Sequence, residues 1–73
     1  MPKLPVLKSR QAMAILEKAG FRRVRQRGSH VQYKRGNLLV TVPNHPGDLN
    51  PQVLHSILRQ AQMTVEELTA LLK

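Results

Sequence analysis

Two short glycine turns, Gly28-Ser29 and Gly36-Asn37, constrain this chain more than any other feature. In each, glycine takes the first central position, where a two-residue hairpin turn needs a positive φ angle. The segments on either side alternate in side-chain character, and the last of them covers residues 38–42. Two hairpins that share their middle strand predict a three-stranded antiparallel meander.

Counting outward from the two turns predicts which residues pair. The predicted pairs are Arg27 with His30, Arg25 with Gln32, Arg23 with Lys34, Tyr33 with Val40, Val31 with Val42, and His30 with Pro43. Because side chains alternate across a strand, the pairing also predicts two faces. The outer face carries Arg23, Arg25, Arg27, His30, Gln32 and Lys34, joined by Leu39 and Thr41, and the core face carries Val24, Gln26, Val31 and Tyr33.

Helical patterns flank the strands. Ser9 is a good N-cap for a first helix over residues 10–19, whose apolar residues recur at helical spacing. Gly20 then supplies a left-handed stop. Asn50-Pro51 predicts the start of a second helix, with Asn as the N-cap and Pro at the first helical position.

A short third helix is predicted after Thr64, because Thr64 and Glu67 can form a capping box. The order α-β-β-β-α-α predicts an α+β fold, with helices packed on one face of the sheet and the other face open. A chain of 73 residues allows one domain, residues 1–73, with a thin core.

The charge distribution predicts an anionic partner. The formal net charge is +8, and no acidic residue lies between Glu17 and Asp48. A surface of one sign repels itself, so we expect it to bind nucleic acid or an acidic protein. The alternative is a basic face that is only solvated.

Several classes of chemistry are excluded. The chain has no cysteine, so it has neither a disulfide nor a thiolate metal site. Its carboxylates are scattered, its histidines lack metal-site spacing, and no glycine-rich phosphate loop precedes a helix. We therefore expect no metal and no cofactor. No stretch has the length of a signal peptide's apolar run or a membrane span, so we expect a cytoplasmic protein.

His30 is the candidate catalytic residue. Histidine exchanges protons near neutral pH. Metal-free RNA cleavage needs a base for the ribose 2′-OH and cations for the charge that develops on the phosphate. His30 with Arg25, Arg27 and Lys34 on one face would supply both. The alternative is that His30 simply fills a position at the end of a strand.

The sequence indicates a second catalytic acid or base less clearly than it indicates His30. His45 lies two residues beyond Pro43, the residue predicted to face His30, and could be the partner acid, a phosphate ligand or an ordinary loop histidine. His55 falls on the polar side of the second helix, where we expect it to be solvated. Tyr33 faces the core, so stacking of RNA bases on this sheet is not expected.

The sequence as a whole resembles the HicA toxin family, over about residues 16–68. The segments that carry the resemblance are Gly20-Phe21, Val24-Arg25-Gln26-Arg27-Gly28-Ser29-His30, Val42-Pro43, His45, Ile57-Leu58-Arg59-Gln60-Ala61, Met63-Thr64 and Glu66-Glu67. The resemblance implies a fold similar to the double-stranded-RNA-binding domain and the activity of an mRNA interferase. It implies that His30 is catalytic, that Gly28 and Ser29 form the turn presenting it, and that a HicB antitoxin neutralises the protein.

The sequence departs from many family members at two places. Asn50-Pro51 stands where many have a Lys-Gly pair, which removes a cation near the site, and Gln62 stands where many have glycine. Duplex binders place a lysine cluster at the start of the second helix, whereas this chain has Asn50-Pro51-Gln52. The substrate expected is therefore single-stranded mRNA.

Three functions are compatible with these residues. The first is a metal-independent endoribonuclease toxin, in which His30 is catalytic and RNA is bound by Arg23, Arg25, Arg27, Ser29 and Lys34. The second is a non-catalytic RNA-binding module of the same fold. The third is a protein whose basic face binds an acidic antitoxin, which is compatible with the first.

Overall fold

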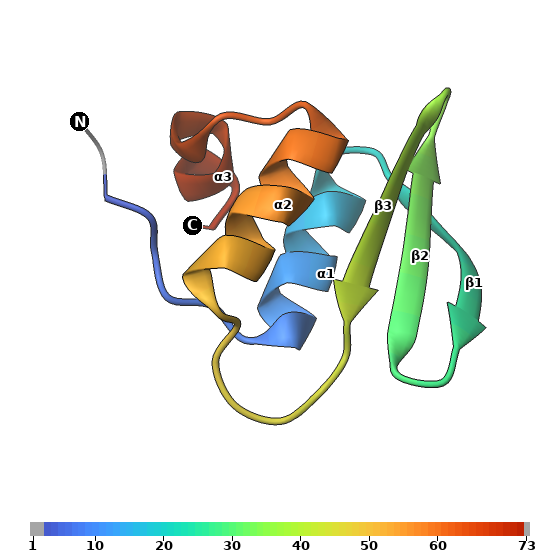
Figure 1. Cartoon of the computed structure of the whole chain (residues 1–73). Helices are drawn as coiled ribbons and strands as arrows, with labels where there is room; N and C mark the ends of the chain where they lie inside the picture. The colour runs from blue at the N-terminus through green and yellow to red at the C-terminus, as the bar shows by residue number, and fades with distance from the viewer. Residues whose placement is uncertain (1–2, 73) are drawn as a thin grey trace.

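Two helices pack on one side of a three-stranded sheet, and a third helix packs on the first of them, in the computed structural model of the chain (Figure 1). The structure describes residues 3–72, and Met1, Pro2 and Lys73 of the predicted domain lie outside the described residues. The elements are α1 (Ser9–Lys18), β1 (Arg22–Arg27), β2 (His30–Arg35), β3 (Leu38–Pro43), α2 (Pro51–Ala61) and α3 (Val65–Leu72). This order confirms the predicted α+β fold, and its α-β-β-β-α part matches the double-stranded-RNA-binding domain.

The sheet is an antiparallel meander in the order β1-β2-β3. Gly28 and Gly36 both have φ 59°, so both predicted turns are confirmed. The pairs observed as predicted are Arg27 with His30, Arg25 with Gln32, Tyr33 with Val40, Val31 with Val42, and His30 with Pro43. Four core-facing side chains of β2 and β3 are completely buried, namely Val31, Tyr33, Val40 and Val42. Their burial is why the pleat of these strands could be predicted.

β1 contains a β-bulge that the alternation pattern did not predict. The register shifts between Arg23 and Arg25, so Arg22 rather than Arg23 lies opposite Lys34. Arg23 lies opposite the buried Tyr33 instead. A bulge adds one residue to one strand, and side chains before it therefore point to the other face. The prediction that Arg23 shares the outer face with Lys34 is wrong.

The bulge also changes the surroundings of its neighbours. Nη2 of Arg23 lies 3.9 Å from Sδ of Met13 in α1. Val24 was predicted to face the core, but it is 48% exposed. Gln26 lies opposite the buried Val31, as predicted, but it is exposed, because β1 is an edge strand. Arg23 therefore extends along the helix side of the sheet.

α1 begins one residue earlier than predicted and ends one residue earlier. Lys8 rather than Ser9 is the N-cap, and Ser9 is the first helical residue. The Ser9 side chain is buried, and its hydroxyl donates to the Pro43 carbonyl at 2.7 Å. This hydroxyl therefore joins α1 to the end of β3 and does not cap its own helix.

The other two helix starts are confirmed. The Asn50 side chain accepts a hydrogen bond from the Gln52 N–H at 2.8 Å, with Pro51 as the first residue of α2. The Thr64 N–H donates to Oε1 of Glu67 at 2.9 Å, and the Glu67 N–H donates to Oγ1 of Thr64 at 3.1 Å. The backbone hydrogen bond from Thr64 is the main reason that the pKa of the Glu67 carboxyl lies below its ordinary value.

The core lies between the helices and one face of the sheet. Tyr33 is buried at its centre, and its hydroxyl donates to Oε2 of Glu17 at 3.1 Å. Burial is the main cause that raises the pKa of Tyr33. Leu7, just before α1, is also buried, and its carbonyl accepts from the Leu49 N–H at 2.7 Å. Within residues 3–72, no helix has the length and apolar character needed to cross a membrane.

Candidate functional site

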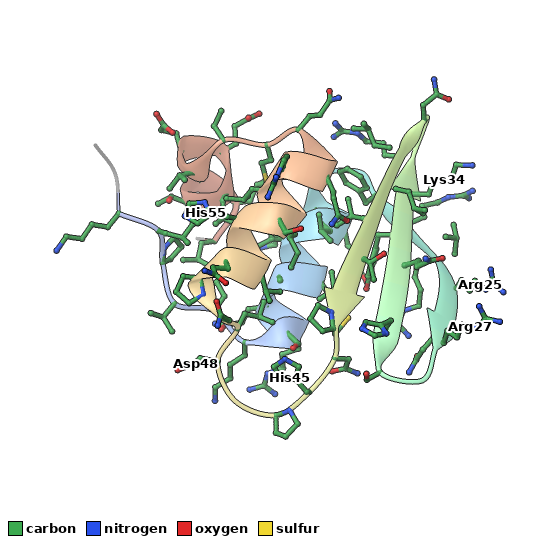
Figure 2. All side chains as sticks on the ribbon, viewed as in Figure 1. Arg25, Arg27, Lys34, His45, Asp48 and His55 are labelled. Carbon is green, nitrogen blue, oxygen red and sulfur yellow. The ribbon has the colours of Figure 1, made fainter. Side chains whose placement is uncertain are left out.

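The face of the sheet turned away from the helices is basic. Its side chains from β1 and β2 are Arg22, Arg25, Arg27, His30, Gln32 and Lys34. Figure 2 shows Arg25, Arg27 and Lys34 on the side of the sheet opposite the helices. All three are exposed, so this face is open to a large ligand.

A shallow pocket of about 280 Å³, here called the His30 pocket, lies on this face. It is lined by Arg25, Arg27, His30, Gln32 and Thr41. The strand ladder explains the grouping, because Arg27 lies opposite His30, Arg25 opposite Gln32, and Gln32 opposite Thr41. Directly opposed side chains on one face have Cβ atoms about 4.5–5.5 Å apart. The three strands thus bring together two guanidinium groups, an imidazole, an amide and a hydroxyl.

The turn before β2 positions His30. Gly28 supplies the positive φ that the tight turn requires, and Arg27 and His30 pair directly across it. The Ser29 carbonyl accepts a hydrogen bond from the Asn44 N–H, which attaches the turn to the loop after β3. The backbone at His30 is therefore fixed by β1 on one side and by the segment after β3 on the other. Its side chain is exposed.

Lys34 and Arg22 form a separate basic area at the other end of the outer face. Together with Val24 they line a neighbouring pocket rather than the His30 pocket. Arg23, for which an RNA contact was predicted, extends toward α1 instead. The structure therefore brings Arg25 and Arg27 to His30, but not Arg23 or Lys34.

His45 does not line the His30 pocket either. It lies in the loop between β3 and α2, in a second pocket with Lys8 and Arg10 (Figure 2). Its Nδ1 lies 3.1 Å from the Pro46 carbonyl oxygen. His55 is exposed on α2 and lies beside the segment before α1, away from His45 (Figure 2).

Gln32 and Thr41 line the His30 pocket although neither was assigned to a site from the sequence. The predicted register already placed both on the outer face, so the signal was present in the pairing across β2 and β3. The Thr41 N–H donates to Oε1 of Gln60 in α2 at 2.9 Å, and Nε2 of Gln60 donates to Oγ of Ser56 at 3.0 Å. These bonds fix the position of β3 beside the pocket.

The chemistry of the His30 pocket suits a phosphodiester. Among the described residues, no carboxylate lines it, so the two arginines are not neutralised there. An imidazole can exchange a proton near neutral pH, and guanidinium groups bind phosphate oxygens through paired hydrogen bonds. No group of three potential metal ligands is found in residues 3–72.

A comparison with protein-family models places these observations in one family. The model described as the HicA toxin of bacterial toxin-antitoxin systems matches residues 9–63. This match runs from the start of α1 to just past the end of α2 and includes every residue of the His30 pocket. No individual curated protein matches the sequence. The chain belongs to the HicA toxin family of bacterial toxin-antitoxin systems.

Proposed function

We propose that this protein is a metal-independent endoribonuclease that cleaves single-stranded mRNA in the bacterial cytoplasm, with His30 as the catalytic base. The observation that supports the proposal most is the His30 pocket itself. It places one proton-exchanging side chain beside Arg25 and Arg27 on an exposed basic face. The HicA family membership supports an RNA target of this kind.

In the proposed reaction, neutral His30 takes the proton from a ribose 2′-OH. The 2′-oxygen attacks the adjacent phosphorus, and the bond from phosphorus to the 5′-oxygen breaks. Water gives a proton to the departing 5′-oxygen, and His30 then releases the proton it took to solvent. The products are a 2′,3′-cyclic phosphate and a 5′-hydroxyl. Arg25 and Arg27 stabilise the negative charge that grows on the phosphate oxygens.

Other cations would position the strand on either side of the reacting phosphate. Lys34 and Arg22 extend the basic outer face beyond the His30 pocket, and Arg22 replaces Arg23 in this role because of the bulge. Ser29 lies exposed in the turn next to His30, where it can contact the strand. Asn50, Pro51 and Gln52 at the start of α2 provide no cation for a duplex, which favours a single strand.

A HicB-like antitoxin is the proposed protein partner. An inhibitor that covers the outer face would neutralise the same cations that bind RNA, so we expect its contacting surface to be acidic. This proposal rests on the family membership and on the formal net charge of +8.

The test is cleavage of a long single-stranded RNA in EDTA by the wild type and by His30→Ala. We expect His30→Ala to cleave at least about a hundredfold more slowly, because general base catalysis contributes about 10²–10⁴-fold. The matched control is His55→Ala, which removes an exposed histidine outside the pocket and should cleave like the wild type.

Equal cleavage by His30→Ala and the wild type would contradict the role of His30, and loss of activity in EDTA would contradict the metal-free mechanism. If the wild type binds the RNA without cleaving it, the protein is the non-catalytic RNA-binding module instead.

A further inference from the structure

We propose that a second pocket, at the junction of α1 and the β3–α2 loop, binds a backbone phosphate of the same RNA strand that is cleaved at His30. This inference rests on the proposed function. The pocket, here called the α1 pocket, is lined by Lys8, Ser9, Arg10 and residues 44–47, including His45. It extends the RNA contact beyond the sheet.

The side chains of the α1 pocket select for an anion. Lys8, Arg10 and His45 come from two separate segments and are all exposed at one pocket. Within the described chain, no carboxylate lines this pocket. Asp48 pairs with Lys8 through the backbone, but it lines a different pocket. Two permanent cations, Lys8 and Arg10, gathered at a pocket without a counter-charge attract an anion.

The α1 pocket is held in place by hydrogen bonds. The buried Ser9 hydroxyl donates to the Pro43 carbonyl at 2.7 Å, and the His45 N–H reaches the same hydroxyl oxygen at 3.4 Å. Nδ1 of His45 lies 3.1 Å from the Pro46 carbonyl oxygen, which leaves Nε2 as the ring nitrogen free to meet a ligand. Both nitrogens donate in an imidazolium, so His45 would donate through Nε2 to a phosphate oxygen in that form. A site that is already ordered loses little entropy on binding.

The α1 pocket lies close enough to the His30 pocket to share one strand. His30 and Pro43 are directly opposed, which puts their Cα atoms about 4.5–5.5 Å apart. His45 lies two positions after Pro43, a span of at most about 7 Å between their Cα atoms. The Cα atoms of the two histidines therefore lie within about 13 Å. A stacked strand carries one phosphate per about 3.4 Å, so the distance corresponds to a few nucleotides.

The same segment of chain links the two pockets. Pro43 closes the ladder opposite His30, Asn44 bonds to the Ser29 carbonyl in the turn before His30, and His45 lines the α1 pocket. A strand whose cleaved phosphate lies at His30 therefore has the α1 pocket next along its path. Lys8 and Arg10 would then contribute to substrate affinity and His45 would act as a phosphate ligand.

The test measures binding of a ten-nucleotide single-stranded RNA in a His30→Ala background, where the strand is not consumed. Lys8→Gln with Arg10→Gln is compared with a matched pair, Lys3→Gln with Arg59→Gln, which removes the same charge elsewhere. We expect the first pair to raise the dissociation constant about fivefold more than the control pair. The salt slope should fall by about 0.7, the value for one phosphate of a single strand that the protein no longer neutralises.

His45→Gln is an independent variant in the other segment of the pocket, and it should also raise the dissociation constant. It keeps the test valid if the double substitution disturbs α1. If the Lys8/Arg10 pair and His45→Gln both match the control pair in affinity and salt slope, the α1 pocket is not part of the RNA site, although the proposed function stands. If the His30→Ala parent fails to bind RNA at all, the proposed function itself is contradicted.

Discussion

Arg25 and Arg27 are the two side chains that we propose hold the phosphate beside His30. Both guanidinium groups line the His30 pocket, and neither is neutralised by a carboxylate there in the described structure. A guanidinium is planar and permanently charged, and its paired N–H groups match two phosphate oxygens. In the proposed reaction, they would supply positive charge beside the phosphate as it gains negative charge.

Arg25→Ala and Arg27→Ala should each lower kcat/KM for RNA cleavage by about tenfold to a hundredfold, because each removes a hydrogen-bond donor that stabilises the transition state. Arg25→Lys keeps the charge but loses the paired hydrogen bonds, so it should recover only part of the activity. Steady-state cleavage rates measure both effects. Arg59→Ala on α2 is the control for net charge, and a loss there as large as at Arg25 would contradict a specific role.

The two edges of the sheet are protected in different ways. β1 carries arginines and a bulge, both of which disfavour pairing with another chain. β3 is joined to α2, because Gln60 accepts the hydrogen bond of the Thr41 N–H. A small sheet with one open face can therefore present that face to RNA without exposing a long unprotected edge.

Local features of the elements were predictable and longer-range ones were not. The turns at Gly28 and Gly36 follow from residue type, so the pairing of β2 with its neighbours could be counted. The bulge depends on which side of β1 packs on α1, through Arg23 and Met13, and no pattern in β1 alone reveals it. The buried role of Ser9 likewise depends on a hydrogen bond to a residue 34 positions away in sequence.

One prediction concerns the end of α2. Gln62, the residue that follows the last residue of α2, has a left-handed backbone with φ 54° and ψ 45°. This conformation costs a non-glycine residue about 1–2 kcal/mol, and the flexibility of glycine in the unfolded chain offsets part of the gain on replacing it. Gln62→Gly should therefore raise the free energy of unfolding by about 0.5–1 kcal/mol.

Denaturant unfolding measures this change. Ala70→Gly, in the exposed part of α3, is the matched control and should lower the free energy of unfolding by about 1 kcal/mol, since glycine is a poor helix former. A destabilising Gln62→Gly would show that the Gln62 side chain contributes more than its backbone conformation costs.

In the whole molecule, one face of the sheet forms the core and the other face remains open to solvent. The helices and the inner face of the sheet enclose the core (Figure 1). The outer face presents the positively charged side chains of β1 and β2. The family and the central residues of the His30 pocket could be predicted, because the Gly28-Ser29-His30 element and its arginines are close in sequence. The α1 pocket could not, because Lys8, Arg10 and His45 meet only after β3 packs against α1.

The most direct measurement of the central claim is the chemistry of the cleaved ends. A single-stranded RNA is incubated with the wild type in EDTA, beside the same strand with one 2′-deoxyribose immediately before the cleaved bond. We predict a 2′,3′-cyclic phosphate and a 5′-hydroxyl from the RNA, and no cleavage at the deoxy position. A 3′-hydroxyl with a 5′-phosphate, or equal cleavage of the deoxy strand, would mean that water attacks the phosphorus, and would contradict the account.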